Sequence, residues 1–302
     1  MGQKPFFSRQ QTLVEKACTE ITGFKDMYSQ MERKLIISGK STSTLVNYSR
    51  SITKVALYFK KIPIDLSNEQ IEEYLMMLKT NKQPSPSYFK HTVYGLRYLF
   101  RIIGREDRAI KLPSLKKERK LPVVFSKEEC RKLFSVPKHL KHRVMLALTY
   151  SAGLRAREVI NLKPEDIDSD RMQIHIRQSK GRKDRYVVLS DYILEGLRKY
   201  WKEYSPVKWL FNGNKPDRKM GVSGVQWIIR EAMKKTNIRK KATIHTLRHS
   251  FATHLLEDGV DIFTIKEQLG HATIQTTMVY LHVARMKRVM PHSPLDTLYG
   301  KR

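Results

Sequence analysis

Six side chains of reactive types lie at spacings that suit the cleavage of a phosphodiester bond. Two belong to the segment Thr243–His249, one follows Leu269-Gly270, one is a tyrosine shortly after it, and two lie upstream. They are Arg155, Lys180, His245, Arg248, His271 and Tyr280. Together they provide two guanidinium groups, an amine, two imidazoles and a phenol. This set predicts cleavage through a covalent link between a tyrosine and a phosphate.

Each predicted role follows from the chemistry of phosphoryl transfer. Negative charge gathers on the non-bridging oxygens, and a planar guanidinium group can bind two of them, so the two arginines suit a clamp on one phosphate. A tyrosine hydroxyl with an ordinary pKa of about 10 is a weak nucleophile at neutral pH. Tyr280 therefore needs a cationic pocket or a neighbouring imidazole, for which His245 and His271 are the candidates. Lys180 is the candidate acid for the leaving 5′-oxygen, because cationic neighbours lower the pKa of a lysine.

At these positions the sequence resembles the tyrosine recombinases, or phage integrases, and is most similar to their compact Xer-type and integron-type members. The resemblance is strongest from Tyr150 to Val283. It rests on the motifs Ser151-Ala152-Gly153-Leu154-Arg155 with Glu158, Gln178-Ser179-Lys180-Gly181-Arg182-Lys183-Asp184-Arg185, His245-x-x-Arg248, and His271 with Tyr280. Glu158 matches the acid near the first arginine, and we expect it to orient its neighbours. Leu281 departs from the family, in which a threonine is common after the tyrosine.

The resemblance implies both a fold and an activity. The fold is mainly α-helical with a small β-sheet: a helical-bundle, SAM-like core-binding domain followed by an α+β catalytic domain. The activity is site-specific recombination, in which DNA strands are cut and rejoined through a 3′-phosphotyrosyl intermediate without ATP, metal or another cofactor. The implied partners are double-stranded recombination sites and four identical protomers on two duplexes, with room for an accessory protein or a second recombinase subunit.

Composition independently points to a polyanionic partner. The 58 lysines and arginines outnumber the 29 acidic residues, which gives a formal charge of +29 and a pI near 10.1. Such a charge attracts phosphate backbones with little regard to base sequence. Cys18 and Cys130 belong to no Cys/His cluster, so neither a zinc site nor a disulfide framework is expected. No apolar stretch is long enough for a membrane span, and we expect a cytoplasmic protein associated with the nucleoid.

The chain is expected to fold as two domains joined by a basic, proline-containing linker at 113–124. Apolar residues at helical spacing predict four helices before this linker, near 24–35, 45–59, 71–78 and 93–103. The expected divisions are an N-terminal extension at 1–22, the helical DNA-binding domain at 23–112, and the catalytic domain at 125–302 with a tail at 290–302.

Polar and basic side chains in both domains are candidate DNA contacts. Ser41, Thr42 and Thr44 match the segment with which the family grips DNA, although serine and threonine at a helix start are also typical helix caps. The other candidates are basic residues that could follow the backbone: Lys90, Arg97, Arg182, Arg185, Lys240 and Lys241. Each of these has the alternative of an ordinary solvated side chain.

Local patterns place the reactive residues on turns and helix ends. Gly153 ends a helix, so Arg155 is expected at the start of the next one. Alternating apolar residues over 172–176 and 186–188 predict a hairpin with Lys180 at its tip.

The histidines near Arg248 are interpreted either as reactive or as structural residues. His245 and Arg248, which are three residues apart, share one face of a predicted helix. His249 and His254 are interpreted as structural residues that point elsewhere.

Several other functions fit the same residues. A type IB topoisomerase uses similar chemistry to relax one duplex, a DNA-binding regulator could keep the fold without the chemistry, and charge alone would also suit a ribosome-associated factor. Chromosome-dimer resolution, mobile-element integration and cassette capture share the same site, although the short interval between Phe211 and His245 disfavours an integron integrase. The tail at 290–302 either docks on a neighbouring protomer, as in relatives, or is disordered.

Overall fold

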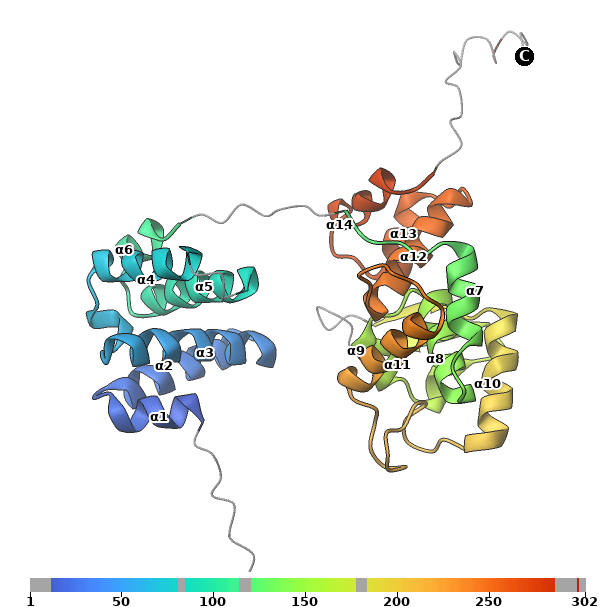
Figure 1. Ribbon diagram of the computed structural model, residues 1–302, viewed down its shortest axis with the longest axis horizontal. Coiled ribbons are helices and arrows are strands. Elements are labelled where there is room, and N and C mark those ends of the chain that lie inside the picture. The colour runs from blue at the N-terminus through green and yellow to red at the C-terminus, as the bar shows by residue number, and fades with distance from the viewer. Residues whose placement is uncertain (1–11, 81–84, 114–120, 178–183, 286–297, 299–302) are drawn as a thin grey trace, which may run out of the picture. The chain divides into compact units, whose positions relative to one another are not determined.

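The computed structural model describes residues 12–80, 85–113, 121–177, 184–285 and 298. The chain divides into two compact units, Met1–Glu118 and Arg119–Arg302 (Figure 1). Helices dominate both units, and a three-stranded sheet lies in the second. The predicted fold class, mainly α-helical with a small sheet, is confirmed.

The regular elements in the described part of the first unit are all helices. They are α1 (Leu13–Glu20), α2 (Phe24–Ile37), α3 (Thr42–Phe59), the 3₁₀ helix η1 (Pro63–Asp65), α4 (Asn68–Thr80), α5 (Pro86–Ile102) and α6 (Glu106–Lys111). The four predicted helices correspond to α2, α3, α4 and α5. Ile52 and Val55 of α3 and Val93 and Leu96 of α5 are fully buried, so these two helices form the centre of the unit's core.

Helix α1 lies within the residues that were expected to form an extension. A capping box begins it: the Thr12 hydroxyl accepts from the N–H of Glu15 at 3.2 Å, and the Glu15 carboxylate accepts from the N–H of Thr12 at 2.6 Å. Ala17 and Ile21 are buried and join the core of the first unit. The helix is short, which is why its apolar periodicity was too weak to predict it.

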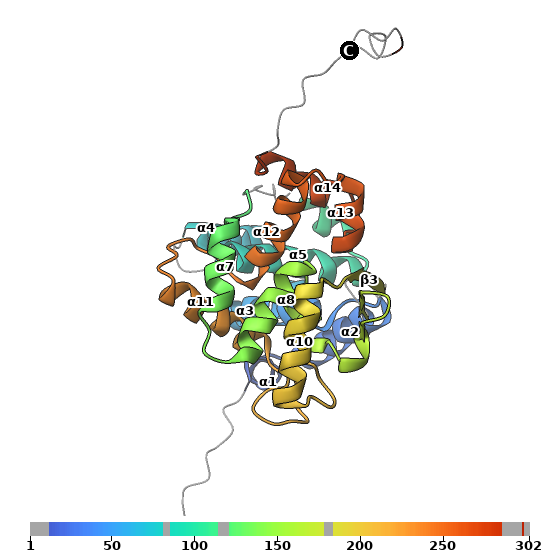
Figure 2. The ribbon, with the colours of Figure 1, turned by 90° about the vertical axis from the view of Figure 1, so that its right-hand side faces the viewer.

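The second unit carries the remaining elements. They are α7 (Lys127–Ser135), α8 (Leu140–Ser151), α9 (Ala156–Asn161), η2 (Pro164–Asp166), β1 (Ile167–Asp168), β2 (Gln173–Ile176), β3 (Arg185–Val188), α10 (Asp191–Tyr204), α11 (Val222–Lys235), α12 (Ile244–Glu257), α13 (Ile262–Leu269), α14 (Gln275–Met278) and η3 (Val279–His282). Helix α8 lies at the centre, packed between α7, α10 and α12 (Figure 2). Its residues from Val144 to Thr149 are all buried, as expected for a helix that is covered on every side.

The sheet confirms the predicted hairpin strands. Its order is β1-β2-β3 and both pairs are antiparallel, with Ile174 opposite Val187 and Ile176 opposite Arg185. Residues 178–183, which were expected to hold Lys180 and Arg182 at the tip, lie outside the described residues.

A separate apolar cluster forms where α12, α13 and η3 meet. It contains Phe251, Ala252, Leu256, Ile265, Leu269 and Tyr280. This cluster joins the C-terminal part of the unit to the helix that carries His245 and Arg248.

Candidate active site

Arg155 lies at the N-cap of α9, directly after the turn that ends α8. Gly153 makes this turn with a left-handed φ of 58°, and a Cβ at this glycine would lie 2.5 Å from the Phe251 ring. The backbone N–H of Arg155 donates to the Glu158 carboxylate at 2.9 Å. The turn at Gly153 and the hydrogen bond to Glu158 together fix the backbone position of Arg155. The predicted place of Arg155 at a helix start is confirmed.

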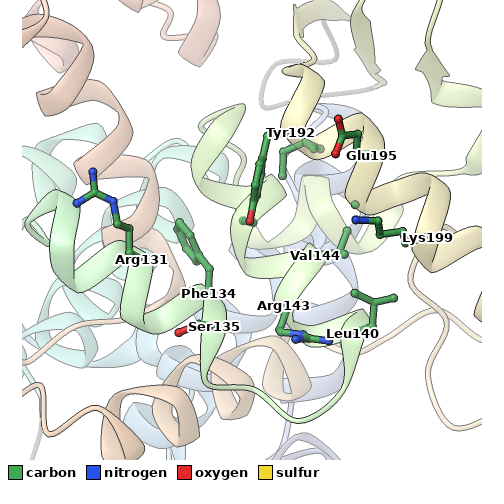
Figure 3. Close-up of a pocket in the computed structure, with 12 residues that line it drawn as sticks. Arg131, Phe134, Ser135, Leu140, Arg143, Val144, Tyr192, Glu195 and Lys199 are labelled. Carbon is green, nitrogen blue, oxygen red and sulfur yellow. The ribbon is translucent and has the colours of Figure 1, made fainter.

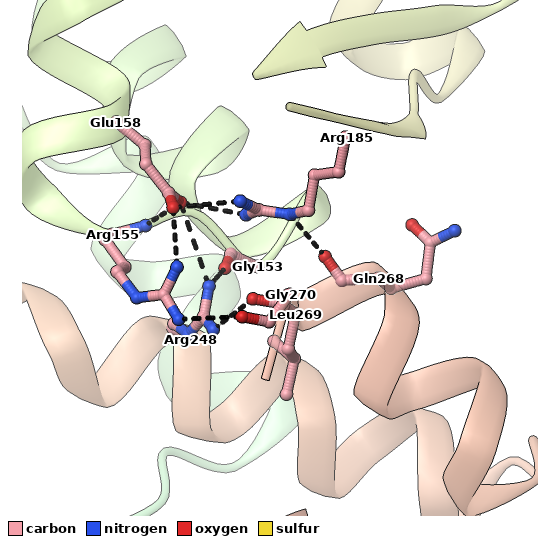
Figure 4. A network of polar contacts seen from close by, with 8 residues as sticks. All are labelled: Gly153, Arg155, Glu158, Arg185, Arg248, Gln268, Leu269 and Gly270. Carbon is pink, nitrogen blue, oxygen red and sulfur yellow. Dashed lines mark hydrogen bonds and ion pairs between the residues drawn. The ribbon is translucent and has the colours of Figure 1, made fainter. Parts of the chain in front are cut away.

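The Glu158 carboxylate is the centre of a network of three arginines (Figure 4). It accepts from Nη1 of Arg155 at 2.7 Å and from both terminal nitrogens of Arg185 at 2.9 Å. Nη1 of Arg248 lies 3.8 Å from the same carboxylate. Burial works to raise the pKa of Glu158, but the hydrogen bonds and charges of Arg185 and Arg155 outweigh it and lower the pKa to about 2.

Glu158→Gln is expected to lower the free energy of unfolding at pH 7 by about 3 kcal/mol, because the neutral amide leaves buried arginines without a counter-charge. The pKa of Glu158 is lower in the folded state than its ordinary value of 4.5. Its contribution is therefore complete above about pH 4.5 and is lost as the pH falls toward 2. Urea unfolding of both proteins at several pH values measures the difference, which should be constant from pH 7 to 5 and shrink below that. A difference that stays constant down to pH 3 would contradict the assigned charge.

Arg248 is almost completely buried at the floor of this network, with 1% of its surface exposed. Its Nη1 donates to the carbonyl of Gly153 at 2.6 Å and its Nη2 to the carbonyl of Leu269 at 2.5 Å. Burial, followed by the charge of Arg155, lowers its pKa to about 9, so the guanidinium group still carries its charge at pH 7. These two bonds occupy two of the five N–H donors of the side chain.

Arg155 donates to the carbonyl of Gly270, the residue that follows Leu269 in the chain. Its Nη2 donates to Gly270 at 3.3 Å, next to the Leu269 carbonyl that binds Arg248. Bonds to these adjacent carbonyls hold both guanidinium groups at the turn after α13, and both groups form ion pairs with the Glu158 carboxylate (Figure 4). Arg155 is the more accessible of the two, with 22% of its side chain exposed.

Arg185, a predicted DNA contact, lies within this network. Only 10% of its side chain is exposed, and its Nε donates to the carbonyl of Gln268 at 2.9 Å. Its Cδ would lie 3.0 Å from a Cβ added at Gly270, which has a left-handed φ of 62°. Arg185 therefore joins β3 to the end of α13, and this contact explains why the turn after α13 requires a glycine.

Tyr280 lies in η3 with its ring in the apolar cluster and only 2% of its surface exposed. Its hydroxyl is 3.0 Å from Nδ1 of His249. Burial raises the pKa of Tyr280, while the charges of Arg248 and Arg155 lower it in part. The charges of both arginines therefore act on the Tyr280 hydroxyl.

His249 is the residue that the sequence interpretation placed wrongly. It was expected to point away from the site, yet its imidazole contacts the Tyr280 hydroxyl and meets the edge of the His245 ring at 4.6 Å between centroids. Burial, followed by the charges of His245 and Arg248, lowers its pKa to about 4. His254 is structural as expected, because its Nδ1 lies 2.8 Å from the hydroxyl of Tyr150.

The two predicted histidines, His245 and His271, have different neighbours. His245 on α12 has an exposed surface, but the protein atoms around its ring reduce the hydration of the imidazole and, followed by the charges of Arg248 and Arg155, lower its pKa. The His271 ring is stacked against Tyr280 at 6.4 Å, and its Nδ1 lies 2.9 Å from the hydroxyl of the buried Thr277. Burial and the nearby arginines lower the pKa of His271 to about 3, so this imidazole is neutral at pH 7.

Some of the predicted DNA contacts bond to other parts of the protein, and others are exposed. Ser41 caps α3, since its hydroxyl accepts from the N–H of Thr44 at 3.2 Å, while Thr42 is exposed and Thr44 and Lys90 are half-buried. Arg97 donates to the carbonyls that end α6, those of Ala109, Leu112 and Pro113. Lys240 donates to the carbonyl of Val124 and pairs with Glu129, whereas Lys241 is exposed. The structure thus gives Arg97 and Lys240 roles in holding the fold.

A hollow of about 700 Å³ lies between α7, α8 and α10 (Figure 3). Its lining combines apolar side chains such as Phe134 and Val144 with the cations Arg131, Arg143 and Lys199. The reactive residues lie elsewhere, at the ends of α8 and α13 and along α12. Among the residues described, no group of three or more His, Cys, Asp or Glu is placed to hold a metal ion, and no helix is long and apolar enough to cross a membrane.

The phage integrase family matches residues 123–287, and the N-terminal SAM-like domain of phage integrases matches residues 27–108. The chain belongs to the phage integrase family. Tyrosine recombinase XerA of Thermococcus kodakarensis is 34% identical to it over 85% of this chain and 91% of the relative. Tyrosine recombinase XerD of Oceanobacillus iheyensis is 33% identical over 82% and 90% of the two chains. The family recognised from the sequence motifs is confirmed.

Solved structures show that this phage integrase fold extends over nearly the whole chain. XerH recombinase bound to a palindromic difH substrate, in a post-cleavage complex, matches with a TM-score of 0.68 and 19% identity over 95% of this chain and 93% of XerH. The Tn1549 transposon integrase, in complex with a circular intermediate DNA, matches with a TM-score of 0.68 and 14% identity over 91% and 99% of the two chains.

Proposed function

We propose that the chain is a site-specific DNA recombinase in which Tyr280 attacks a DNA phosphate held by Arg155 and Arg248. The observation that carries this proposal is that both arginines bond to the Leu269-Gly270 turn while their charges act on the pKa of the buried tyrosine. Family membership and the charge of +29 support DNA as the substrate.

The arginine pair supplies the positive charge that the transition state needs. Each guanidinium group keeps N–H donors beyond those bonded to the carbonyls and to Glu158. Because these bonds hold both groups in place before DNA arrives, little reorganisation is needed when charge develops on the phosphate oxygens. His271, neutral and held at Nδ1 by Thr277, would donate from Nε2 to the same phosphate, and His245 would help to position it.

Attack by Tyr280 forms a bond between its oxygen and phosphorus and breaks the bond to the 5′-oxygen. The departing oxygen would take its proton from Lys180, which lies outside the described residues in the segment between β2 and β3. The product is a 3′-phosphotyrosyl link that retains the energy of the phosphodiester. A 5′-hydroxyl of a partner strand can therefore reverse the step without ATP, and the guanidinium groups provide the charge without a metal ion.

Strand exchange between two duplexes requires four cleavage events, so we propose a homotetramer with one protomer for each strand. Double-stranded recombination sites are the DNA partner, with an accessory protein or a second recombinase subunit as a further component of some reactions. Because such DNA lies in the nucleoid, the protein would act there, in the cytoplasm. The charge of +29 also predicts that binding weakens steeply as salt rises.

Nicked duplexes taken from the DNA that flanks the gene provide the test. A protein–DNA band that resists denaturant is expected with the unaltered chain, and recombinant strands are expected when two duplexes of different length are mixed. Relaxation of plasmid without strand exchange would instead indicate a topoisomerase, and binding without a covalent band would indicate a DNA-binding regulator.

Thr277→Val is expected to slow covalent cleavage by about tenfold at saturating DNA, because it removes the hydroxyl that orients His271 while preserving shape in a buried position. The half-saturating DNA concentration should change little. Thr277→Ser keeps the hydroxyl and serves as the matched control, so it should cleave at nearly the unaltered rate. Equal rates for the valine and serine variants would show that the hydroxyl has no part in the reaction.

A further inference from the structure

Tyr280, the nucleophile of the proposed reaction, is buried, so water has little access to accept the proton of its hydroxyl. Only 2% of Tyr280 is exposed, and burial raises the pKa of its hydroxyl. At neutral pH the hydroxyl must therefore lose its proton to a protein group during the attack. In the described part of the chain, Nδ1 of His249 lies 3.0 Å from this hydroxyl, where the unprotonated nitrogen of a neutral imidazole accepts the hydrogen bond that Tyr280 donates.

We propose that His249 is the general base of the cleavage step, and that its Nδ1 takes the proton of the Tyr280 hydroxyl as the phenolic oxygen bonds to phosphorus. This assignment rests on the proposed function. The distance of 3.0 Å is within the range for direct proton transfer, and it already exists without DNA.

The Tyr280 oxygen gains its bond to phosphorus and loses its proton, His249 becomes an imidazolium, and the 5′-oxygen leaves with a proton from Lys180. In the rejoining step His249 returns its proton to the phenolic oxygen, while the attacking 5′-hydroxyl gives up its own to Lys180. Both groups therefore end the cycle in the protonation state in which they began.

The other two histidines of the site are less suited to this role. His271 lies against the face of the tyrosine ring, and its Nδ1 is bonded to Thr277. His245 is exposed and contacts the ring of His249, and among the described residues it has no hydrogen bond to the Tyr280 hydroxyl. His249 alone among the histidines described has a ring nitrogen bonded to the nucleophile.

The charges around His249 explain how DNA would activate it. The groups against it are His245 and Arg248 on α12 and Tyr280 on η3, with Arg155 and His271 across the tyrosine. Arg248 is one of the causes that lower the pKa of His249, which makes the imidazole neutral but weakly basic. A phosphate bound at Arg248 offsets that charge, so the imidazole becomes a stronger base when the substrate is in place.

His249→Ala tests the assignment in single-turnover cleavage of a nicked duplex. We expect a loss of roughly 100-fold or more at pH 7, restored in part by added imidazole. Between pH 7 and 9 the deficit should shrink by about tenfold per pH unit, because the variant depends on tyrosinate formed by hydroxide. A 5′-bridging sulfur in the substrate removes the need for a leaving-group proton, so it should rescue Lys180→Ala but not His249→Ala.

His254→Ala is the matched control, because His254 lies on the same helix and bonds a different tyrosine through the same ring nitrogen. It should lose thermal stability yet show neither imidazole rescue nor the altered pH profile. A His249→Ala variant with the unaltered pH profile, or one rescued by the sulfur substrate, would overturn the assignment while leaving the recombinase function intact. Failure of the unaltered protein to form any covalent complex would overturn both.

Discussion

Arg155→Ala is expected to lower the single-turnover rate of covalent DNA cleavage by about 1,000-fold, because it removes the more accessible half of the phosphate clamp. Arg155 reaches the site from the Gly153 turn and is held by Glu158 and Gly270. Arg155→Lys keeps the charge but not the planar fork, so it should recover only a small part of the rate. The rate at which the denaturant-resistant protein–DNA complex forms at saturating DNA gives the cleavage rate of both variants.

Arg157→Ala is the matched control for this experiment, since Arg157 lies two positions further along and is exposed. Its cleavage rate should stay close to that of the unaltered protein. If Arg155→Ala cleaved as fast as Arg157→Ala, the phosphate would have to be held by groups other than the proposed clamp.

Arg248→Ala should combine a loss of cleavage with a large loss of stability. The alanine leaves the carbonyls of Gly153 and Leu269 without their donors. Removing one member of a buried charged network costs about 3–5 kcal/mol of unfolding free energy. Arg248→Lys retains one positive charge but cannot reach both carbonyls with a planar group, so it should be intermediate in stability and still defective in cleavage. Thermal and urea unfolding, followed by cleavage below the melting range of each variant, separate the two effects.

Arg198, an exposed arginine of α10, provides the comparison for Arg248. Arg198→Ala should change the free energy of unfolding by less than about 0.5 kcal/mol. A stability loss for Arg248→Ala as small as this would show that its contacts with the two turns contribute little to the fold.

The placement of the arginines was predictable because local rules determine it. Gly153 and Gly270 both end helices in the left-handed conformation, which fixes the starts of the segments that carry Arg155 and His271. His245 and Arg248 were also placed correctly on one helix, since residues three apart lie on neighbouring parts of a helix surface.

His249 was missed although the same rule could have found it. It lies four residues after His245, and residues four apart share a helix face. What the sequence could not show was that η3 brings Tyr280 to this face, because that contact depends on packing of Phe251 and Leu269 in the apolar cluster.

Arg185 was counted in the basic turn before Tyr186, whereas β3 already begins at Arg185. Tyr186 and Val188 were taken as the patterned positions, yet more than half of each is exposed, and Val187 between them is 1% exposed. Since alternate residues of a strand share a face, Arg185 points inward with Val187. The Tyr186 ring finds its partner on the surface, stacked on His175 at 4.8 Å.

The most direct test of the account is to identify the residue that becomes attached to DNA. The denaturant-resistant complex would be formed on a nicked duplex, digested with trypsin and nuclease, and its nucleotide-bearing peptide sequenced by mass spectrometry. A nucleotide joined through its 3′-phosphate to Tyr280 is expected, and no complex is expected with Tyr280→Phe, which should still bind DNA. A nucleotide on any other residue, or a complex that survives Tyr280→Phe, would contradict the assignment of Tyr280 as the nucleophile.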